Sequence, residues 1–281
     1  MTTPALPPWP SPAAFIQRLD VRPSRGLSQN FLTDQGLAAR LAGDVDLPSP
    51  MTPVVEIGPG TGALTWHLAR RTEHLVALEL DSVLAAALAD WFSALPHVSI
   101  RQADALEADF DALAAELGGP FMVAGNLPYG ISTPLLTRLA RFHRAVAGFH
   151  ILLQREVVQK MTLAPGDRHG TPLGILLTRV YQLSAGLRVP AGVFLPPPEV
   201  ESQVLVGTRR AAPLFEADDC RLLTLVSQAF ARRRKMLAAN LSPLFGGREK
   251  VLDALAQADI SAQSRAEELT MEQWARLYLH C

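Results

Sequence analysis

The chain has 281 residues, of which 48% are hydrophobic and 19% are charged. This balance excludes wholesale disorder and provides enough apolar side chains for a large core. Two cysteines, Cys220 and Cys281, lie far apart, which excludes a disulfide scaffold and a cysteine-based zinc site. The N-terminus does not have the pattern of a signal peptide, and no apolar run approaches the ~20 residues of a membrane helix. We expect a soluble cytoplasmic protein that uses no metal and does not bind a membrane.

Charge is divided unevenly along the chain. Residues 1–126 contain 7 Lys and Arg against 14 Asp and Glu, whereas residues 127–281 contain 19 against 13. A basic second half can bind phosphates despite a formal net charge of −1, because phosphate binding needs only a local positive surface. Solvated helix faces explain the same asymmetry, so charge alone leaves both interpretations open.

Residues 1–24 are rich in proline and predict an extended arm with at most one short helix. After the arm, apolar strands alternate with helical patterns, which is typical of βαβ units on a parallel sheet. We expect strands at Val54–Ile57, His74–Leu80, Val98–Arg101, Phe121–Ala124 and Phe149–Leu153, and helices at Ala63–Arg71, Ser82–Ala94, Ala105–Leu117 and Thr133–Phe142.

The strand pattern stops after about residue 208. The remaining segment predicts helices at Cys220–Leu241, Glu249–Ala258 and Met271–Leu279. We therefore expect an arm at 1–24, an α/β domain at 25–208 and a small helical domain at 209–281.

A glycine-rich turn, Gly58–Gly62, follows the first strand and opens a helix. Glycine at Gly58 and Gly60 permits a tight turn and lets a ligand approach the backbone without meeting a Cβ. The segment fits both the dinucleotide pattern GxGxxG/A and the GxGxG loop of S-adenosylmethionine enzymes. By itself it does not choose between them.

Two acidic residues lie at or just after the ends of the next two strands. Glu79 lies 21 residues after Gly58, a spacing at which a carboxylate accepts hydrogen bonds from the ribose hydroxyls of an adenosine cofactor. A solvated carboxylate at a strand end is the alternative. Asp104 follows the third strand and is either an acceptor for the adenine amine or the N-cap of a helix.

The tetrapeptide Asn126-Leu127-Pro128-Tyr129 follows the fourth strand, at the sheet edge where ligands bind. The side-chain carbonyl of Asn126 and the backbone carbonyl of Leu127 can each accept one N–H of a planar exocyclic amine, which aims the nitrogen lone pair at a methyl donor. Tyr129 can stack on the base, and Pro128 fixes the turn between them. An ordinary strand-to-helix turn with Asn126 as its cap is the alternative. Proximity and orientation would supply most of the catalysis.

These motifs resemble the ribosomal RNA adenine dimethyltransferases of the KsgA/RsmA type, from about Arg25 to Leu277. The glycine turn and the Asn-Leu-Pro-Tyr segment stand in the family's order. The other matching blocks are Ser28–Leu32, Gln154–Val157, Phe194–Ser202, Phe230 with Arg232–Lys235, and Arg265–Leu269.

The resemblance implies a Rossmann-like methyltransferase fold of the S-adenosylmethionine-dependent class, followed by a small helical domain. It implies S-adenosyl-L-methionine as methyl donor, with S-adenosyl-L-homocysteine as product, and no metal. Asn30, Leu32, Gly58, Gly60, Glu79, Asp104 and Asn126 would line the cofactor site. A proline-rich arm outside that match is expected to contribute little to cofactor affinity.

By the same resemblance the substrate would be two adjacent adenosines near the 3′ end of small-subunit rRNA, each dimethylated at N6, with a role in small-subunit biogenesis. The partner would be the rRNA or the pre-30S particle, and no protein partner is inferable. Phe194 would stack on a flipped adenine, or else it is a core aromatic. Arg232, Arg233, Arg234 and Lys235 would contact RNA phosphates, or else they form in part a solvated helix face.

Three positions depart from the family pattern. Ser28 stands where glycine is usual and also occurs in the Erm enzymes, which methylate large-subunit rRNA. His169 replaces a usual tyrosine, and Glu199 replaces a usual lysine. Large-subunit methylation, and a non-catalytic assembly or RNA-binding factor on the same fold, are therefore the alternative functions.

Overall fold

The computed structural model describes residues 9–19, 29–163, 166, 170–232 and 234–281. Two compact units divide the chain, one made of Met1–Val158 with Ser184–Arg209 and the other of Gln159–Leu183 with Arg210–Cys281. Segment 159–183, which the sequence assigns to the α/β domain, thus groups with the C-terminal residues. Within the described residues, no helix is long and apolar enough to cross a membrane.

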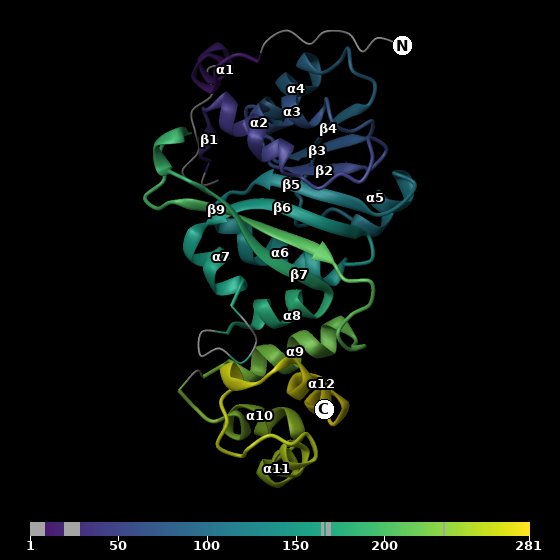
Figure 1. The fold of residues 1–281 in the computed structure, drawn as a ribbon, viewed down its shortest axis with the longest axis vertical. Coiled ribbons are helices and arrows are strands. Elements are labelled where there is room, and N and C mark those ends of the chain that lie inside the picture. Colours follow the sequence, from purple (N-terminus) through teal and green to yellow (C-terminus); the bar gives the residue numbers. More distant parts are fainter. Residues whose placement is uncertain (1–8, 20–28, 164–165, 167–169, 233) are drawn as a thin grey trace. The chain divides into compact units, whose positions relative to one another are not determined.

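The first unit contains a seven-stranded sheet in the order β4-β3-β2-β5-β6-β9-β7 (Figure 1). Strands β4, β3, β2, β5 and β6 run parallel, and β9 pairs antiparallel with β6. Their bounds are β2 Val54–Ile57, β3 Leu75–Glu79, β4 Val98–Gln102, β5 Phe121–Asn126, β6 Val146–Gln154, β7 Tyr181–Val189 and β9 Ser202–Arg209. Rossmann-like topology is thereby confirmed, with an antiparallel addition that the sequence analysis does not predict.

Burial explains why the central strands are mostly apolar. Every residue of β2 and β3 is buried, as expected for parallel strands covered on both faces. The helices of this unit are α1 Pro12–Leu19, α2 Gln35–Gly43, α3 Ala63–Leu68, α4 Ser82–Trp91, α5 Phe110–Glu116 and α6 Ser132–Arg141, and α7 Arg155–Met161 begins in it. Aspartates cap three of them: Asp34 at α2, Asp81 at α4 and Asp109 at α5.

A short second sheet joins two distant parts of the sequence. Strand β1, Phe31–Leu32, pairs antiparallel with β8, Phe194–Leu195. The N–H of Thr33 extends this pairing by donating to the carbonyl of Val193 at 2.8 Å. This pairing fixes the backbone next to Asn30.

The second unit is mainly helical, with α8 Pro172–Val180, α9 Asp219–Ala229, α10 Leu237–Phe245, α11 Arg248–Gln257 and α12 Met271–Leu279. Trp274 is fully buried in its core, where its ring stacks on Phe230 at a centroid distance of 6.2 Å. Helix α8 contacts α9 and lies in sequence far before the other helices. The helical character predicted for the C-terminal region is therefore correct, but α8 belongs to the same unit.

One predicted helix is wrong. The expected helix Cys220–Leu241 is two helices, α9 and α10, and the described residues between them, 230–232 and 234–236, are not helical. The amide of Asn240 replaces the helical hydrogen bonds there: its Nδ2 donates to the carbonyls of Ala229, at 2.6 Å, and Arg232, at 3.2 Å. A buried side chain thus satisfies the carbonyl that ends α9.

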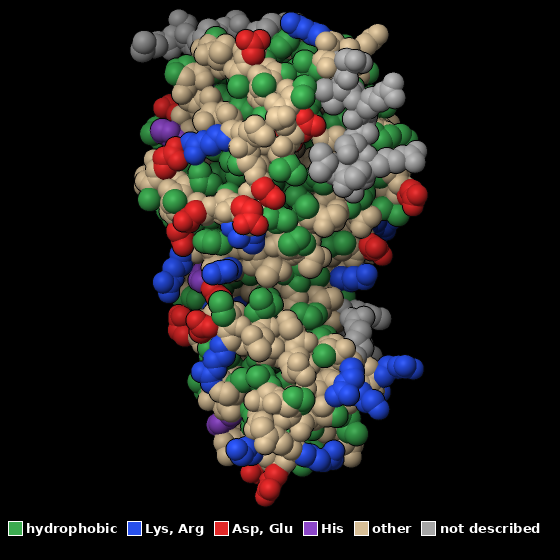
Figure 2. Space-filling view, turned by 180° about the vertical axis from the view of Figure 1, so that it is seen from behind, with side chains coloured by type: hydrophobic (Ala, Val, Ile, Leu, Met, Phe, Trp, Pro, Cys, Tyr) green, Lys and Arg blue, Asp and Glu red, His purple; other side chains and the backbone are tan. Residues whose placement is uncertain are grey.

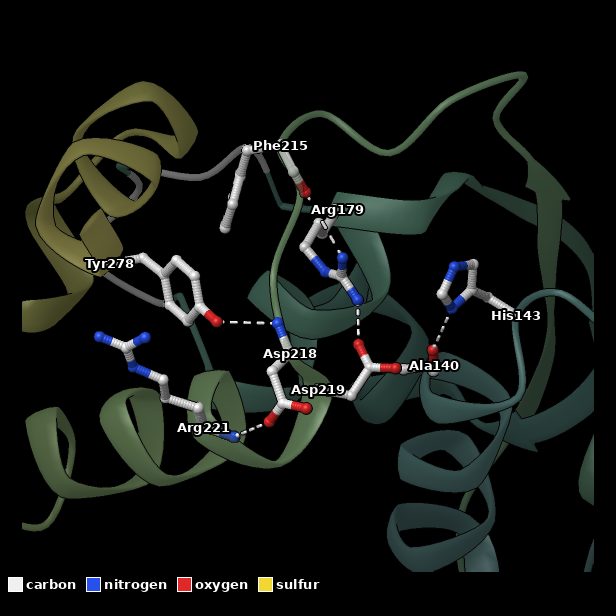
Figure 3. A network of polar contacts seen from close by, with 8 residues as sticks. All are labelled: Ala140, His143, Arg179, Phe215, Asp218, Asp219, Arg221 and Tyr278. Atoms are coloured by element: carbon white, nitrogen blue, oxygen red, sulfur yellow. Dashed lines mark hydrogen bonds and ion pairs between the residues drawn. The ribbon is translucent and has the colours of Figure 1, made fainter.

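The C-terminal helix α12 is hydrogen-bonded to the residue that precedes α9 (Figure 3). The hydroxyl of Tyr278 accepts a hydrogen bond from the backbone N–H of Asp218 at 2.8 Å. The nearly fully buried guanidinium of Arg179, on α8, pairs with the carboxylate of Asp219. Both contacts hold the 210–219 segment within this unit.

Candidate functional site

A cavity of about 190 Å³ lies in the first unit, where β2, β3 and β5 end. This is the edge of an open α/β sheet at which ligands bind. All the residues predicted for the cofactor site and the Asn-Leu-Pro-Tyr segment line it: Asn30, Leu32, Gly58, Gly60, Glu79, Asp104, Asn126, Leu127, Pro128 and Tyr129. The structure therefore brings these dispersed residues to one place.

The glycine loop after β2 has the conformation that its sequence requires. Gly58 and Gly60 both have positive φ, +66° and +58°, a region that other residues rarely adopt. A Cβ on Gly60 would also lie 2.9 Å from Cδ1 of Phe31. Glycine at these positions therefore permits the turn, and at Gly60 it also leaves room for the ring of Phe31.

Glu79 connects this loop to the end of β3. Its Oε2 accepts a hydrogen bond from the N–H of Gly60 at 2.9 Å, and its Oε1 accepts one from the N–H of Asp81 at 2.9 Å. Burial raises the pKa of this carboxyl above its usual value, while the two N–H donors oppose the shift. Each oxygen keeps a further lone pair, so Glu79 can still accept the hydroxyls of a ribose.

Asp104 lines the cavity from the loop after β4, and its side chain is exposed. Its Oδ1 accepts a hydrogen bond from the N–H of Leu106 at 2.8 Å. The helix predicted from Ala105 begins instead at Phe110, and Asp109 is its N-cap. Asp104 therefore holds a turn rather than an α-helix.

Asn126 is the last residue of β5, and a residue outside that strand fixes the orientation of its side chain. Its Nδ2 donates a hydrogen bond to the backbone carbonyl of Asn30 at 2.8 Å. Because the amide nitrogen is engaged there, Oδ1 is the atom of this side chain that remains to accept a hydrogen bond from a ligand. Leu127 is buried, and its N–H donates to the carbonyl of Leu152 at 3.3 Å.

Tyr129 is half-buried at the start of the turn that leads into α6. Its hydroxyl lies 2.8 Å from the hydroxyl of Ser202, a fully buried residue at the start of β9. This hydrogen bond fixes one end of the aromatic ring. The arrangement suits a ring that offers its face to a planar base.

Two buried polar residues that the sequence analysis does not select also line the cavity, Glu56 on β2 and His150 on β6. Ala124 pairs with both, so they stand in one row of the sheet. Burial raises the pKa of Glu56 to about 8 and lowers that of His150 below its usual value. A polar residue inside an otherwise apolar parallel strand is the signal that could have identified each of them.

Phe194 is 4% exposed and belongs to the core around β1 and β8. It is not among the residues that line the cavity. In this structure it packs as a core aromatic, and stacking on a base would require it to turn outward. Exposed Glu199 lies in the same proline-rich segment.

The described residues of the basic run, Arg232, Arg234 and Lys235, lie in the second unit, between α9 and α10 rather than on a helix. Arg232, Arg234 and Lys235 are exposed there, and Figure 2 shows Lys and Arg side chains gathered on one side of this unit. A turn lets neighbouring side chains spread over one surface, which a helix would not allow. Arg233, Ser28 and His169 lie outside the described residues.

No group of three or more His, Cys, Asp or Glu side chains that could hold a metal ion occurs in the part of the chain that the structure describes. The polar groups that line the cavity include carboxylates, amides, hydroxyls, the imidazole of His150 and backbone N–H groups. Their variety suits an organic ligand with both apolar and hydrogen-bonding parts.

Comparison with known proteins identifies the family. A family model described as ribosomal RNA adenine dimethylase matches residues 22–281. Proteins named ribosomal RNA small subunit methyltransferase A are 38% identical over 250 residues in Erwinia tasmaniensis and 39% identical over 250 residues in Acinetobacter baylyi, covering 89% of both chains in each case.

Solved structures agree with this match. The 23S rRNA methyltransferase ErmE is 28% identical with a TM-score of 0.66, covering 89% of this chain and 99% of that one. A dimethyladenosine transferase from Plasmodium falciparum, 20% identical with a TM-score of 0.74 over 89% of this chain and 96% of that one, shares the fold. With its glycine loop, its Asn-Leu-Pro-Tyr turn and a family match over nearly its whole length, this chain belongs to the ribosomal RNA adenine dimethylase family.

Proposed function

We propose that this protein transfers methyl groups from S-adenosylmethionine to N6 of two adjacent adenosines of small-subunit rRNA, two to each base. The observation that carries this proposal is the orientation of Asn126, whose amide nitrogen donates to Asn30 and whose oxygen is left to accept from a substrate amine. The names of the relatives that are 38% and 39% identical support the small subunit as the substrate.

The cavity fits the proposed cofactor in three respects. The positive-φ glycines leave the backbone open to a ligand, and Glu79 presents carboxylate oxygens beside them. Oε2 of Glu56 is buried in the cavity wall beside Thr65 and has no hydrogen bond of good geometry from the described residues. An ammonium group such as that of a bound methionine moiety would satisfy this oxygen.

When bound, the cofactor supplies a methyl group on a positively charged sulfur. Oδ1 of Asn126 and the carbonyl oxygen of Leu127 would accept the two N–H groups of adenine N6 in the first transfer, and one of them would accept the single remaining N–H in the second, which would turn the nitrogen lone pair toward that methyl. In each transfer a C–N bond would form as the C–S bond breaks, and the methylated nitrogen would then lose one proton. Tyr129 would hold the base by stacking, so orientation supplies most of the rate.

Methyl transfer from labelled S-adenosylmethionine to unmethylated small and large ribosomal subunits tests the proposal, with the modified nucleosides identified afterwards. Dimethyladenosine on the small subunit is the expected result. Asn126→Ala should abolish transfer while leaving binding to the particle intact. Loss of binding together with activity would instead assign Asn126 a structural role.

A second candidate, methylation of the large subunit, is favoured by the likeness to ErmE. Label on the large subunit would establish it in place of the first proposal. The same assay separates a non-catalytic assembly factor, which would bind the particle and the cofactor without transferring label to either subunit.

A further inference from the structure

An aromatic cluster of Trp9, Phe15, Trp91 and Phe92 joins the N-terminal segment to helix α4. The ring of Trp9 stacks on Phe92 at a centroid distance of 5.5 Å and an interplanar angle of 12°, and it meets Trp91 edge-on at 4.9 Å. Trp9 is only 8% exposed. Trp9, Phe15 and Ile16 are therefore part of the core of the first unit.

Trp9 also contacts the glycine loop. Gly62 has a φ of +80° and precedes α3 as its N-cap. A Cβ at this position would lie 2.8 Å from Cζ2 of Trp9 and 2.7 Å from Cδ2 of Leu88. The indole ring thus fills the space that a side chain on Gly62 would need.

The loop lies between this contact and the cavity. Residues 58–61, 63 and 64 line the cavity, whereas Gly62 does not. The N–H of Gly62 donates to the carbonyl of Pro59 at 2.8 Å, which closes the turn. A displacement of Gly62 would move the backbone on both sides of it, including Gly60 and its hydrogen bond to Glu79.

We infer that Trp9 is a positioning residue for the methyl donor, which it serves by holding the glycine loop in its ligand-binding conformation. Three glycines within five residues give the loop many alternative conformations. Packing that restricts these conformations before binding lowers the entropy lost on binding. The inference rests on the proposed function for the identity of the ligand, and it reverses the expectation that the N-terminal arm contributes little to cofactor affinity.

Isothermal titration of the full-length chain with S-adenosylmethionine tests this role, below the temperature at which any variant begins to unfold. We expect Trp9→Ala to raise Kd about tenfold, which corresponds to about 1.4 kcal/mol. Trp9→Phe keeps an aromatic ring behind Gly62 and should stay within about threefold of the wild type. Should Trp9→Ala fail to fold, Trp9→Leu provides the same comparison with a smaller cavity.

Phe110→Leu is the matched control. Phe110 is fully buried in the same unit and packs edge-on against Phe121, at 5.9 Å. This variant should lower the melting temperature without changing Kd for the cofactor. In steady-state assays, Trp9→Ala should raise KM for S-adenosylmethionine while kcat and KM for rRNA change little.

A lowered melting temperature with an unchanged cofactor Kd in Trp9→Ala would overturn the inference, because Trp9 would then only stabilise the fold. A change confined to KM for rRNA would overturn it as well. A wild-type chain that binds no S-adenosylmethionine would refute the proposed function itself, and this inference with it.

Discussion

The hydroxyl groups of Tyr129 and Ser202 lie 2.8 Å apart, although the residues are 73 positions apart in the sequence. Ser202 is fully buried, so it has a fixed position from which to orient the half-buried tyrosine. The site thus depends on β9 for the placement of a residue that follows β5.

Ser202→Ala should therefore lower kcat/KM for methyl transfer by about two- to tenfold, since one hydrogen bond contributes roughly 0.5–1.5 kcal/mol. Tyr129→Phe removes the same bond and should have a similar effect. The double variant should lose little more than either single one, because both changes remove one interaction. Additive losses in steady-state kinetics would show that the two hydroxyls act independently.

The buried carboxyl of Glu56 predicts a pH dependence of stability. Its pKa is raised from 4.5 to about 8, mainly by burial and further by the charge of Glu79. The folded state therefore holds the proton more tightly than the unfolded state. The resulting stabilisation is complete below pH 4.5, decreases as pH rises from there, and is lost above about pH 8.

Glu56→Gln keeps the shape of the side chain without the ionisation. We expect the urea midpoint of the variant to rise relative to that of the wild type as pH increases from about 5 to about 8.5. Glu107→Gln, at an exposed position, should follow the wild-type curve. Parallel curves for all three proteins would contradict the raised pKa.

The basic turn predicts a salt-dependent contribution to RNA binding. Arg232 donates to the carbonyl of Ala239 at 3.0 Å, so the double variant Arg234→Ala, Lys235→Ala removes charge with less risk to the fold. Its affinity for small-subunit rRNA should fall, and the slope of log K against log salt should decrease by roughly 0.7–0.9 for each phosphate that the variant no longer neutralises.

Filter binding at several salt concentrations measures that slope. The control removes the same charge from the same unit at two exposed positions of α11, Arg248→Ala with Lys250→Ala. An equal decrease of slope in both double variants would mean that net charge, rather than the turn, determines binding.

Tyr278→Phe should destabilise the chain by about 1–2 kcal/mol, because the N–H of Asp218 loses its acceptor. The ring and its contact with the Arg221 guanidinium, 5.0 Å from the ring centroid, remain. Urea unfolding gives the difference. Leu279→Gln, at a neighbouring position that is 75% exposed, should have no effect beyond about 0.5 kcal/mol; equal losses in both variants would refute the role of the hydroxyl.

The sequence was sufficient for features that depend on local pattern. Apolar strands, the glycine turn and the acid that ends β3 are each marked by a pattern within a few neighbouring residues. Because parallel strands bring their carboxyl ends to one edge, the order of these motifs also predicted which residues line the cavity.

Features that depend on distant pairing were not predictable in this way. From its sequence position, Phe194 resembles an aromatic residue that stacks on a base. It is buried because its strand pairs with Leu32, 162 residues earlier in the chain. The end of α9 depends on the amide of Asn240, whose hydrogen bonds follow from tertiary packing rather than helix propensity. Trp9 lies in a proline-rich segment whose composition gives no sign of a buried ring.

The division of the chain between the units also determines how parts of it can be exchanged. A chimera that took only residues 209–281 from another family member would separate Asp219 from Arg179, which is 2% exposed. The buried guanidinium would then be paired only if the donor sequence places an acidic residue beside it. An unpaired guanidinium at this position would lower the stability substantially. Grafts intended to transfer substrate preference should therefore carry residues 159–183 together with residues 210–281.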